Sequence, residues 1–260
     1  MKVEQIFEFP VKGLKGKTIP CGTISNRGLN MDRRWMLVDD SNSFLSQRQI
    51  PSLTQLTPSF DDGLSIASLA NNESIEIDLN DFLNEEEVEV WGQVVKAKRA
   101  SEEVNEWLSN KVKQTVKLFF MDEESIRPIR SEKEGDIVSF ADGYPLLLTG
   151  SASLDDLNEK LERQITIDRF RTNVHVSTAL PYEEETWKRI KIGEVIFRVA
   201  KKCARCQVIN IDQETGLVSK EPLKTLSTYR KEGNKVNFGV NLIPESFGII
   251  HEDDTITVLD

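Results

Sequence analysis

Apolar and polar residues alternate along much of the chain, and this period of two is typical of half-buried β-strands. The clearest case is residues 188–200, which alternate over most of their length. The apolar run at 144–149 follows a turn signal and indicates a fully buried strand. Further extended segments are predicted at 5–10, 32–39, 75–90, 168–176, 207–212, 236–243 and 255–259.

Three segments carry the helical period of 3.6 residues instead. The first spans 101–112, with Ser101 as its N-cap. The second spans 154–161 behind a capping serine at Ser153, and the third begins around 221–230 with a proline in its first turn. With so few helices among so many strands, the sequence predicts a mainly β chain of the α+β class.

The length of the chain, 260 residues, suits one large domain or two of ordinary size. An acidic loop at 121–125 separates the strand-rich first part from a second set of strands and helices. It marks a predicted boundary within 115–130, so the expected domains are residues 1–120 and 121–260.

The net charge is −10, which argues against a general nucleic-acid binder. Three cysteines, Cys21, Cys203 and Cys206, are too few for a disulfide framework and favour a reducing compartment. The N-terminus lacks a signal-peptide core, and no run approaches the ~20 apolar residues that span a bilayer. We therefore expect a cytoplasmic protein without a nucleic-acid or membrane partner.

Candidate chemistry centres on 201–206, where two thiols and three cations follow the strand predicted at 188–200. Nearby cations favour the thiolate, the form that attacks electrophiles and binds soft metals. Cys206, directly beside Arg205, is therefore the first candidate for a reactive or metal-binding thiol. The alternative is a pair of half-buried thiols without chemistry, since free cysteine is often simply core.

Other candidate residues are dispersed along the chain. The loop at 11–17 holds three lysines and two glycines, a composition that could hold an anion. In the strand predicted at 168–176, Arg171, Asn173 and His175 share one face because they are two residues apart. One thiolate amid scattered cations and amides suits an anionic, phosphate-bearing ligand whose soft metal is held by cysteine.

Several familiar kinds of site fit less well. A structural zinc site needs four ligands, and beyond Cys203 and Cys206 the chain offers only Cys21, His175 and His251. Thioredoxin-like exchange needs a motif that opens a helix, whereas this one stands between two predicted strands. No Walker or dinucleotide-type phosphate loop, G-x-S-x-G elbow or H-E-x-x-H helix is present. A Cys–His hydrolase that pairs Cys206 with His175 stays open.

Eight sequence blocks, in order, carry a family resemblance: Phe9–Gly13, Asp32-Arg33, Asp142–Pro145, Phe170–Asn173, Ala204–Cys206, Val208–Gly216, Glu221–Leu226 and Phe238-Gly239. Together they resemble the MOSC family of molybdenum-cofactor proteins, especially its amidoxime-reducing members. The resemblance covers essentially the whole chain and implies two β-rich, barrel-like domains, a MOSC N-terminal domain followed by the MOSC domain.

The resemblance implies a molybdenum cofactor, Mo-molybdopterin, with Cys206 as the protein ligand of the metal and the catalytic residue. This chain departs from the family pattern at several of the implied positions: Gly13 and Ala204 replace serines, Gly143 and Tyr144 replace Thr-Ser, and Asn241 replaces a tyrosine. The implied cofactor-binding residues are Lys12, Gly13, Arg33, Gly143, Tyr144, Arg171, Asn173, Ala204, Arg205, Cys206 and Asn241.

The reaction implied by the resemblance is reduction of an N–O bond, in which R–NH–OH, two electrons and two protons give R–NH2 and water. Asp142 and His175 are the candidate proton donors. The chain has no four-cysteine cluster for iron–sulfur, so electrons are expected from a separate flavin reductase, ferredoxin-like protein or b-type cytochrome. The alternatives are a cofactor carrier or sulfurtransferase with a Cys206 persulfide, and a non-catalytic module that stores a phosphorylated ligand.

Overall fold

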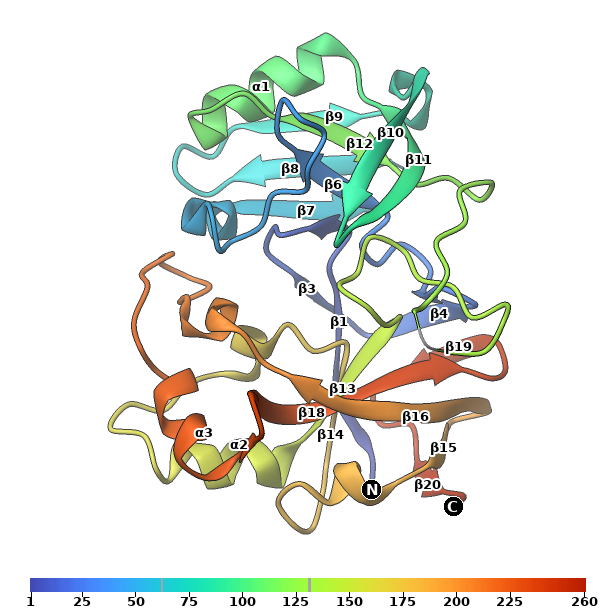
Figure 1. Ribbon diagram of the computed structural model, residues 1–260, viewed down its shortest axis with the longest axis vertical. Coiled ribbons are helices and arrows are strands. Elements are labelled where there is room, and N and C mark those ends of the chain that lie inside the picture. Colours follow the sequence, from blue (N-terminus) through green and yellow to red (C-terminus); the bar gives the residue numbers. More distant parts are fainter. Residues whose placement is uncertain (62, 131) are drawn as a thin grey trace.

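The computed structural model describes residues 1–61, 63–130 and 132–260. The chain is mainly β with three α-helices, which confirms the predicted fold class. Figure 1 shows two halves stacked along the long axis: α1 and strands β6 to β12 above, and a large sheet with α2 and α3 below. Both chain ends lie at the lower end of the molecule.

The lower half is built on a nine-stranded sheet. Its first strand in sequence, β1, pairs with β14 and β3, so the start of the chain belongs to the same sheet as the C-terminal strands. From edge to edge the order is β20 (Ile256–Val258), β15 (Arg189–Ile192), β16 (Val195–Ala204), β18 (Lys235–Pro244), β13 (Leu146–Gly150), β14 (Val174–Val176), β1 (Val3–Glu8) and β3 (Lys17–Ile19), with β17 (Lys231–Glu232) beside β18.

Three smaller sheets complete the β structure. One has the order β10 (Asn84–Val90), β11 (Gln93–Arg99), β12 (Lys117–Phe120), β6 (Trp35–Val38) and β2 (Val11–Lys12). The others are β7 (Leu56–Phe60), β8 (Leu64–Ser68) and β9 (Ser74–Ile77), and β19 (Gly248–His251), β4 (Cys21–Ser25) and β5 (Gly28–Leu29). Within the described residues the sheets are open rather than closed barrels. An isolated bridge between Lys2 and Thr255 and the hydrogen bond from the amide of Ile256 to the carbonyl of Met1 link the start of the chain to the far edge of the large sheet.

Helix α1 (Glu102–Val112) forms where the sequence predicts it, because Val104, Leu108 and Val112 are buried on one face. Its buried Asn105 donates to the carbonyl of Ala100 at 3.1 Å and accepts from the amide of Leu118 at 2.9 Å, which ties the helix to β12. The other helices are α2 (Ser151–Asn158), α3 (Leu223–Tyr229) and the 3-10 turns η1 (Pro51–Gln55), η2 (Leu79–Asp81), η3 (Ile167–Phe170), η4 (Glu183–Thr186) and η5 (Gln207–Asn210).

Four local predictions are wrong. The strand predicted at 188–200 is divided into β15 and β16, because a turn at Gly193, with φ 55°, separates them. Helix α2 begins at Ser151, so Ser153 lies inside it and its buried hydroxyl donates to Glu184 at 2.9 Å. Residues 207–210 form η5 rather than a strand, because Ile209 packs beside Leu226 of α3 instead of pairing in a sheet. Residues 167–171 form η3 and a left-handed residue, so only Val174–Val176 of the strand predicted at 168–176 is extended.

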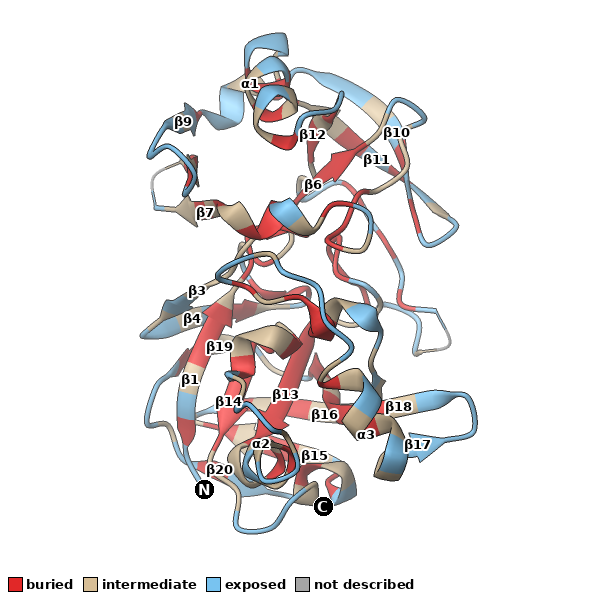
Figure 2. Ribbon diagram, turned by 90° about the vertical axis from the view of Figure 1, so that its left-hand side faces the viewer, coloured by how far each residue is buried: buried red, intermediate tan, exposed pale blue. Residues whose placement is uncertain are grey.

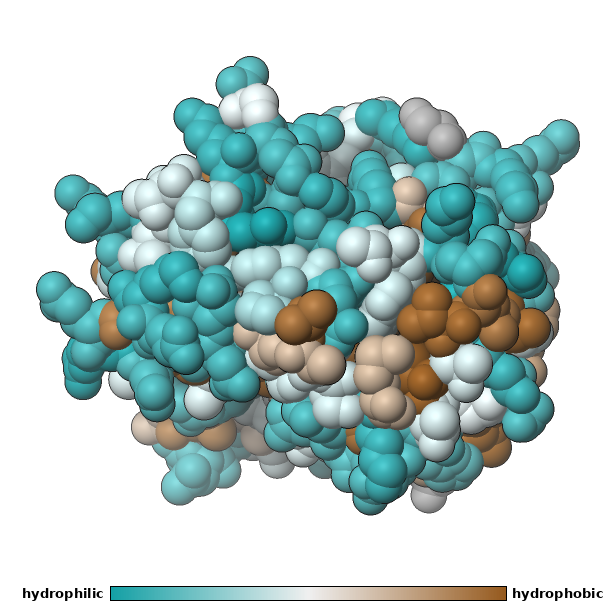
Figure 3. Space-filling model, turned by 90° about the horizontal axis from the view of Figure 1, so that it is seen from below, coloured by the Kyte–Doolittle hydropathy of each residue, from teal (hydrophilic) through white to brown (hydrophobic). Residues whose placement is uncertain are grey.

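Buried residues run through the middle of both halves and through loops between them, while many outer loops are exposed (Figure 2). The lower end of the molecule presents a mostly hydrophilic face with some apolar side chains (Figure 3). Among the residues that the structure describes, no helix combines the length and the apolar character needed to cross a membrane. The cytoplasmic location and the domain boundary near residue 120 stay predictions.

Candidate functional site

A pocket of about 180 Å³ is lined by residues from both halves. Each half supplies loops that follow strands, so segments far apart in sequence meet at one place. All eleven residues that the family resemblance implies for cofactor binding line this pocket. The remaining lining residues are Ser46, Gln47, Ala141, Asp142, Leu146, Leu147, Phe170, Cys203 and Val208.

Two arginines of the pocket adopt the left-handed backbone conformation, Arg33 with φ 51° and Arg171 with φ 52°. Non-glycine residues rarely adopt this conformation, and such strain concentrates at functional sites. Both guanidinium groups lie 4.4 Å from the centroid of the Phe9 ring. Nη1 of Arg171 also donates to the carbonyl of Leu14 at 2.6 Å. The two cations are therefore held close together on one aromatic side chain.

Asp32 anchors this arrangement from a fully buried position. Its carboxylate lies 2.5 Å from Nη1 of Arg33 and accepts from the amide of Phe9 at 2.9 Å and from Nδ2 of Asn173 at 3.0 Å. Asn173 in turn accepts from Arg33 at 3.1 Å and from the amide of Leu147 at 3.2 Å. One buried carboxylate thus fixes three of the segments that form the pocket.

Gly16 lets its loop lie against the ring of Phe9, and this contact gives a first prediction. A Cβ at residue 16 would come within 2.9 Å of three ring atoms of Phe9, which is itself buried. We expect Gly16→Ala to lower the free energy of unfolding by about 1–3 kcal/mol, because the ring must move against two guanidinium groups. Chemical denaturation measures the change. Gly143→Ala is the control, since a Cβ there has no atom within 4 Å among the described residues; equal losses in both variants would contradict the argument.

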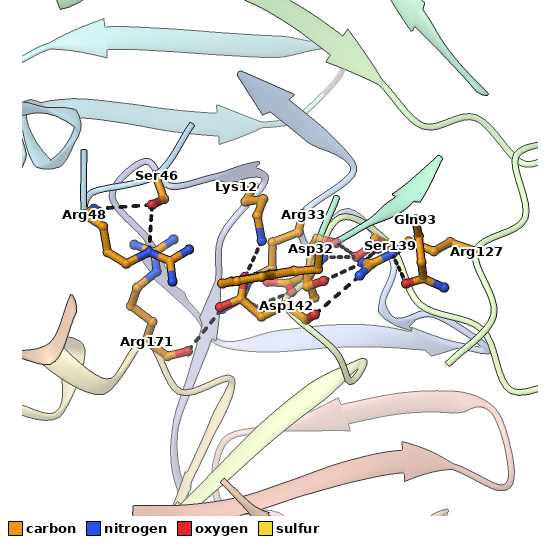
Figure 4. A network of polar contacts seen from close by, with 12 residues as sticks. Lys12, Asp32, Arg33, Ser46, Arg48, Gln93, Arg127, Ser139, Asp142 and Arg171 are labelled. Carbon is orange, nitrogen blue, oxygen red and sulfur yellow. Dashed lines mark hydrogen bonds and ion pairs between the residues drawn. The ribbon is translucent and has the colours of Figure 1, made fainter. Parts of the chain in front are cut away.

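Lys12 and Asp142 form an ion pair across the pocket between the two halves (Figure 4). Lys12 is buried, and this burial lowers its pKa to about 8 although the carboxylate of Asp142 acts in the opposite direction. Desolvation alone would raise the pKa of Asp142, but the ammonium of Lys12 outweighs it and holds that pKa well below its ordinary value. Asp142 is therefore a carboxylate near neutral pH, which removes it as a candidate proton donor.

The two thiols of the pocket have different surroundings. Cys206 is an exposed free thiol just after the end of β16. The guanidinium of Arg205 donates to Sγ of Cys203 at 2.9 Å and to the carbonyl of Phe170 at 2.6 Å. The cation expected to serve Cys206 thus contacts Cys203, and among the described residues Cys206 makes no hydrogen bond through its side chain.

His175 does not share the pocket with Arg171 and Asn173, contrary to the prediction, because Arg171 leaves the strand. Its ring is buried on β14, where Nδ1 lies 3.0 Å from the hydroxyl of Thr149 and Nε2 lies 3.7 Å from Glu4. Burial lowers the pKa of His175. Since His175 does not line the pocket, the structure does not support a pair with Cys206.

Sequence reasoning missed the contribution of the loop at 46–48. Ser46 and Gln47 line the pocket, and Oγ of Ser46 accepts from Nε of Arg48 at 3.3 Å. Gln47 exchanges amide hydrogen bonds with Gln213 at 3.0 and 3.1 Å, which fixes the turn at 213–216 against the upper half. No local signal marks this loop, because its role depends on the stacking of the two halves.

The charges of the pocket are unbalanced. Lys12 and Arg33 have carboxylate partners, whereas neither Arg171 nor Arg205 has an aspartate or glutamate oxygen within 4.0 Å in the described part of the chain. Burial and the neighbouring Arg33 lower the pKa of Arg171 to about 9. Buried or half-buried cations that have no carboxylate partner favour an anionic ligand. Among the described residues, no group of three or more His, Cys, Asp or Glu side chains could hold a metal ion.

Comparison with known proteins gives the family. The MOSC N-terminal beta barrel domain matches residues 1–115, and the MOSC domain matches residues 135–257. The chain is 30% identical to a molybdenum cofactor sulfurase of Oryza sativa subsp. japonica over 92% of its own length, but it spans only 32% of that protein.

It is also 29% identical to mitochondrial amidoxime-reducing component 1 of Mus musculus, over 88% of this chain and 71% of the relative. The human protein of the same name is 27% identical over 99% of this chain and 82% of the relative. The two domain matches leave only residues 116–134 and 258–260 uncovered. The chain belongs to the MOSC family, with the family's N-terminal domain followed by its MOSC domain.

Proposed function

We propose that this protein binds Mo-molybdopterin in the pocket and reduces N-hydroxylated compounds with electrons from a separate redox protein. The observation that carries the proposal is a free, exposed thiol, Cys206, in one pocket with Arg171 and Arg205, two arginines that have no carboxylate partner among the described residues. A thiolate is a suitable soft ligand for molybdenum, and guanidinium groups bind phosphate in a bidentate manner.

The chemical groups of the pocket residues suit this cofactor, because they include a thiol for the metal and cations for the phosphate. Cys206 would bind the metal, and the other ten residues of the implied cofactor-binding set would hold the pterin and its phosphate. A Cβ at Gly143 would meet no atom within 4 Å among the described residues, so backbone there is open to a ligand. The hydroxyl of Tyr144 donates to Glu132 at 2.8 Å and is directed to that partner, which leaves the backbone of Tyr144 for the pocket.

When bound, the cofactor supplies two-electron redox chemistry at a metal. The protein contributes binding, orientation and proton supply. Arg33 and Arg171 are fixed on Phe9 and would orient the anionic part of the cofactor. Leu146, Leu147 and Phe170 line the pocket with apolar surface that excludes water. Lys12 would act as the proton donor in place of His175 and Asp142. Its Nζ, beside Asp142, has a pKa of about 8 and therefore carries a proton near neutral pH.

The proposed partners are a small N-hydroxylated substrate and an electron donor such as a flavin reductase, a ferredoxin-like protein or a b-type cytochrome. A net charge of −10 would attract a donor with a basic docking face. We also propose a cytoplasmic location, which the small number of cysteines supports, because three cysteines suit a reducing compartment.

Purified protein tests the reductase proposal. Molybdenum bound at about one atom per chain, together with reduced-dye-driven conversion of a hydroxylamine to an amine, would support it. Bound molybdenum without conversion of any N-hydroxylated compound would contradict the proposed reductase activity but would still support binding of the cofactor. A phosphorylated ligand with neither metal nor turnover would instead indicate a storage module.

A second function, sulfur or cofactor transfer through a Cys206 persulfide, is favoured by the similarity to the molybdenum cofactor sulfurase of rice. Cyanide releases sulfane sulfur from persulfides as thiocyanate, which can be measured directly. Thiocyanate from wild-type protein, delivery of sulfur to an acceptor enzyme and no reductase turnover would favour transfer over reduction.

The pKa of Lys12 predicts how anion binding changes with pH. Because that pKa is lowered to about 8, the ammonium is charged below pH 8 and neutral above it. We expect sulfate, a probe anion whose own charge is constant over this range, to bind more weakly as the pH rises from 7 to 9, since Lys12 loses its positive charge. Isothermal titration calorimetry measures the affinity. In Lys12→Met this decrease should be smaller, because Arg171, with its pKa lowered to about 9, is the remaining pocket cation that loses charge in this range. A decrease as large as that of the wild type would show that Lys12 is not the group that titrates.

A further inference from the structure

The tip of the β10–β11 hairpin, defined here as Trp91-Gly92-Gln93, reaches from the upper half to the loop that carries Asp142. Nε1 of Trp91 donates to Oδ1 of Asp142 at 3.2 Å. Nη2 of Arg130 donates to the carbonyl of Gly92 at 2.8 Å, and Nε2 of Gln93 donates to the carbonyl of Pro128 at 3.0 Å. Three successive residues of the hairpin tip are therefore hydrogen-bonded to the segment that connects β12 with β13.

Arg127 extends this contact towards the pocket. Its Nε donates to Oε1 of Gln93 at 3.0 Å, and its Nη1 donates to the carbonyls of Ser139 at 2.8 Å and Ala141 at 2.6 Å (Figure 4). The side chain of Arg127 is almost fully buried. Since its hydrogen bonds fix the backbone just before Asp142, the position of that carboxylate depends on the hairpin tip.

Trp91 is an unusual residue for its place. It occupies the first central position of a two-residue turn between the paired residues Val90 and Gln93, with φ 52°, followed by Gly92 with φ 70°. Turns of this type favour asparagine, aspartate or glycine, because other side chains are strained at positive φ. Trp91 is also 41% exposed, so burial of the ring does not explain its presence.

The indole ring has a second link to the pocket. The guanidinium of Arg48 lies 4.5 Å from its centroid, and Arg48 donates to Ser46, which lines the pocket. The Phe44 ring lies 5.0 Å from Trp91 and also 5.0 Å from Nζ of Lys12. Trp91 thus contacts two side chains beside the pocket, Phe44 and Arg48, although Trp91 itself does not line the pocket.

We propose that Trp91 is a positioning residue, whose indole N–H holds the exposed carboxylate of Asp142 against the buried ammonium of Lys12. Without this bond the carboxylate, which is 70% exposed at its side chain, would turn into water for part of the time. Lys12 would then lose its counter-ion while Arg33 and Arg127, the other charged groups that act on it, repel its charge. The inference rests on the proposed function only for its effect on cofactor retention.

The test is the reactivity of Lys12 in cofactor-free protein, measured by competitive acetylation with acetic anhydride from pH 6 to 10 and mass spectrometry. Trp91→Phe keeps an aromatic ring but removes the N–H donor. We expect Lys12 in this variant to be acetylated about 3- to 10-fold faster at pH 7, because its pKa falls. The matched control is Trp107→Phe in α1, whose ring packs under Lys111.

Acetylation of Lys12 in Trp91→Phe at the wild-type rate, or more slowly, would overturn the inference. Trp91→Ala serves as the second variant, and it should show at least the same increase. The molybdenum content of the wild-type protein is measured separately. Absence of the metal would therefore contradict the proposed function but would not change the interpretation of the acetylation rates. In cofactor-loaded protein, we expect Trp91→Phe to weaken retention of the cofactor more as pH rises.

Discussion

Cys206→Ser is expected to abolish reductase turnover while leaving the fold intact. Cys206 is exposed and makes no side-chain hydrogen bond among the described residues, so a hydroxyl costs little stability. As the only proposed protein ligand of the metal, however, it has no substitute in the pocket. Even residues that merely orient a metal ligand cost 10–100-fold in affinity or activity when changed, so we expect a loss of at least about 100-fold. Reduced-dye-driven conversion of a hydroxylamine measures it.

Cys203→Ser is the matched control, since both thiols line the same pocket three residues apart. A serine hydroxyl at 203 can still accept the hydrogen bond that Arg205 now donates to the thiol. We therefore expect most of the activity to remain. An equal loss in the two variants would contradict a single-cysteine site and would instead support a dithiol mechanism.

Asp32→Ala is expected to produce the largest loss of stability. The carboxylate is fully buried and has three donors around it: the guanidinium of Arg33, the amide of Phe9 and the side chain of Asn173. Removal leaves a cation and two N–H groups without their partner. Breaking a buried ion pair on one side costs about 3–5 kcal/mol, which we expect as the decrease in the free energy of unfolding.

Chemical denaturation measures this decrease, and two variants make the result specific. Asp32→Asn keeps the shape and an acceptor oxygen but loses the charge, so it should lie between wild type and Asp32→Ala. Asp40→Ala removes an exposed aspartate a short distance along the chain and should change stability by less than about 0.5 kcal/mol. A loss below about 1 kcal/mol for Asp32→Ala would show that Asp32 does not anchor the pocket.

The sequence predicts much of the candidate site because the relevant residues lie in short blocks with a family resemblance. Lys12, Arg33, Arg171 and Cys206 are widely separated in sequence, yet they line one pocket. Periodicity alone would not have brought them together, since it describes one element at a time. The fold class and helix α1 were predictable for the opposite reason, because their patterns are local.

The failures occur where tertiary contacts override a local pattern. Residues 168–176 alternate like a strand, but the amide of Arg171 bonds to the carbonyl of Asp168 at 2.9 Å and closes a turn. The apolar residues of 207–210 pack against α3 and not into a sheet. Trp91 and the loop at 46–48 gain their place only when the two halves meet, so no sequence pattern identifies them.

The central claim is that Cys206 and the pocket cations hold a molybdenum cofactor. The most direct test is the molybdenum and pterin content of freshly purified wild-type protein, with Cys206→Ser prepared in parallel. We predict about one molybdenum and one pterin per wild-type chain, and loss of the metal in the variant. Wild-type protein that contains neither molybdenum nor pterin, after growth with ample molybdate, would contradict the account.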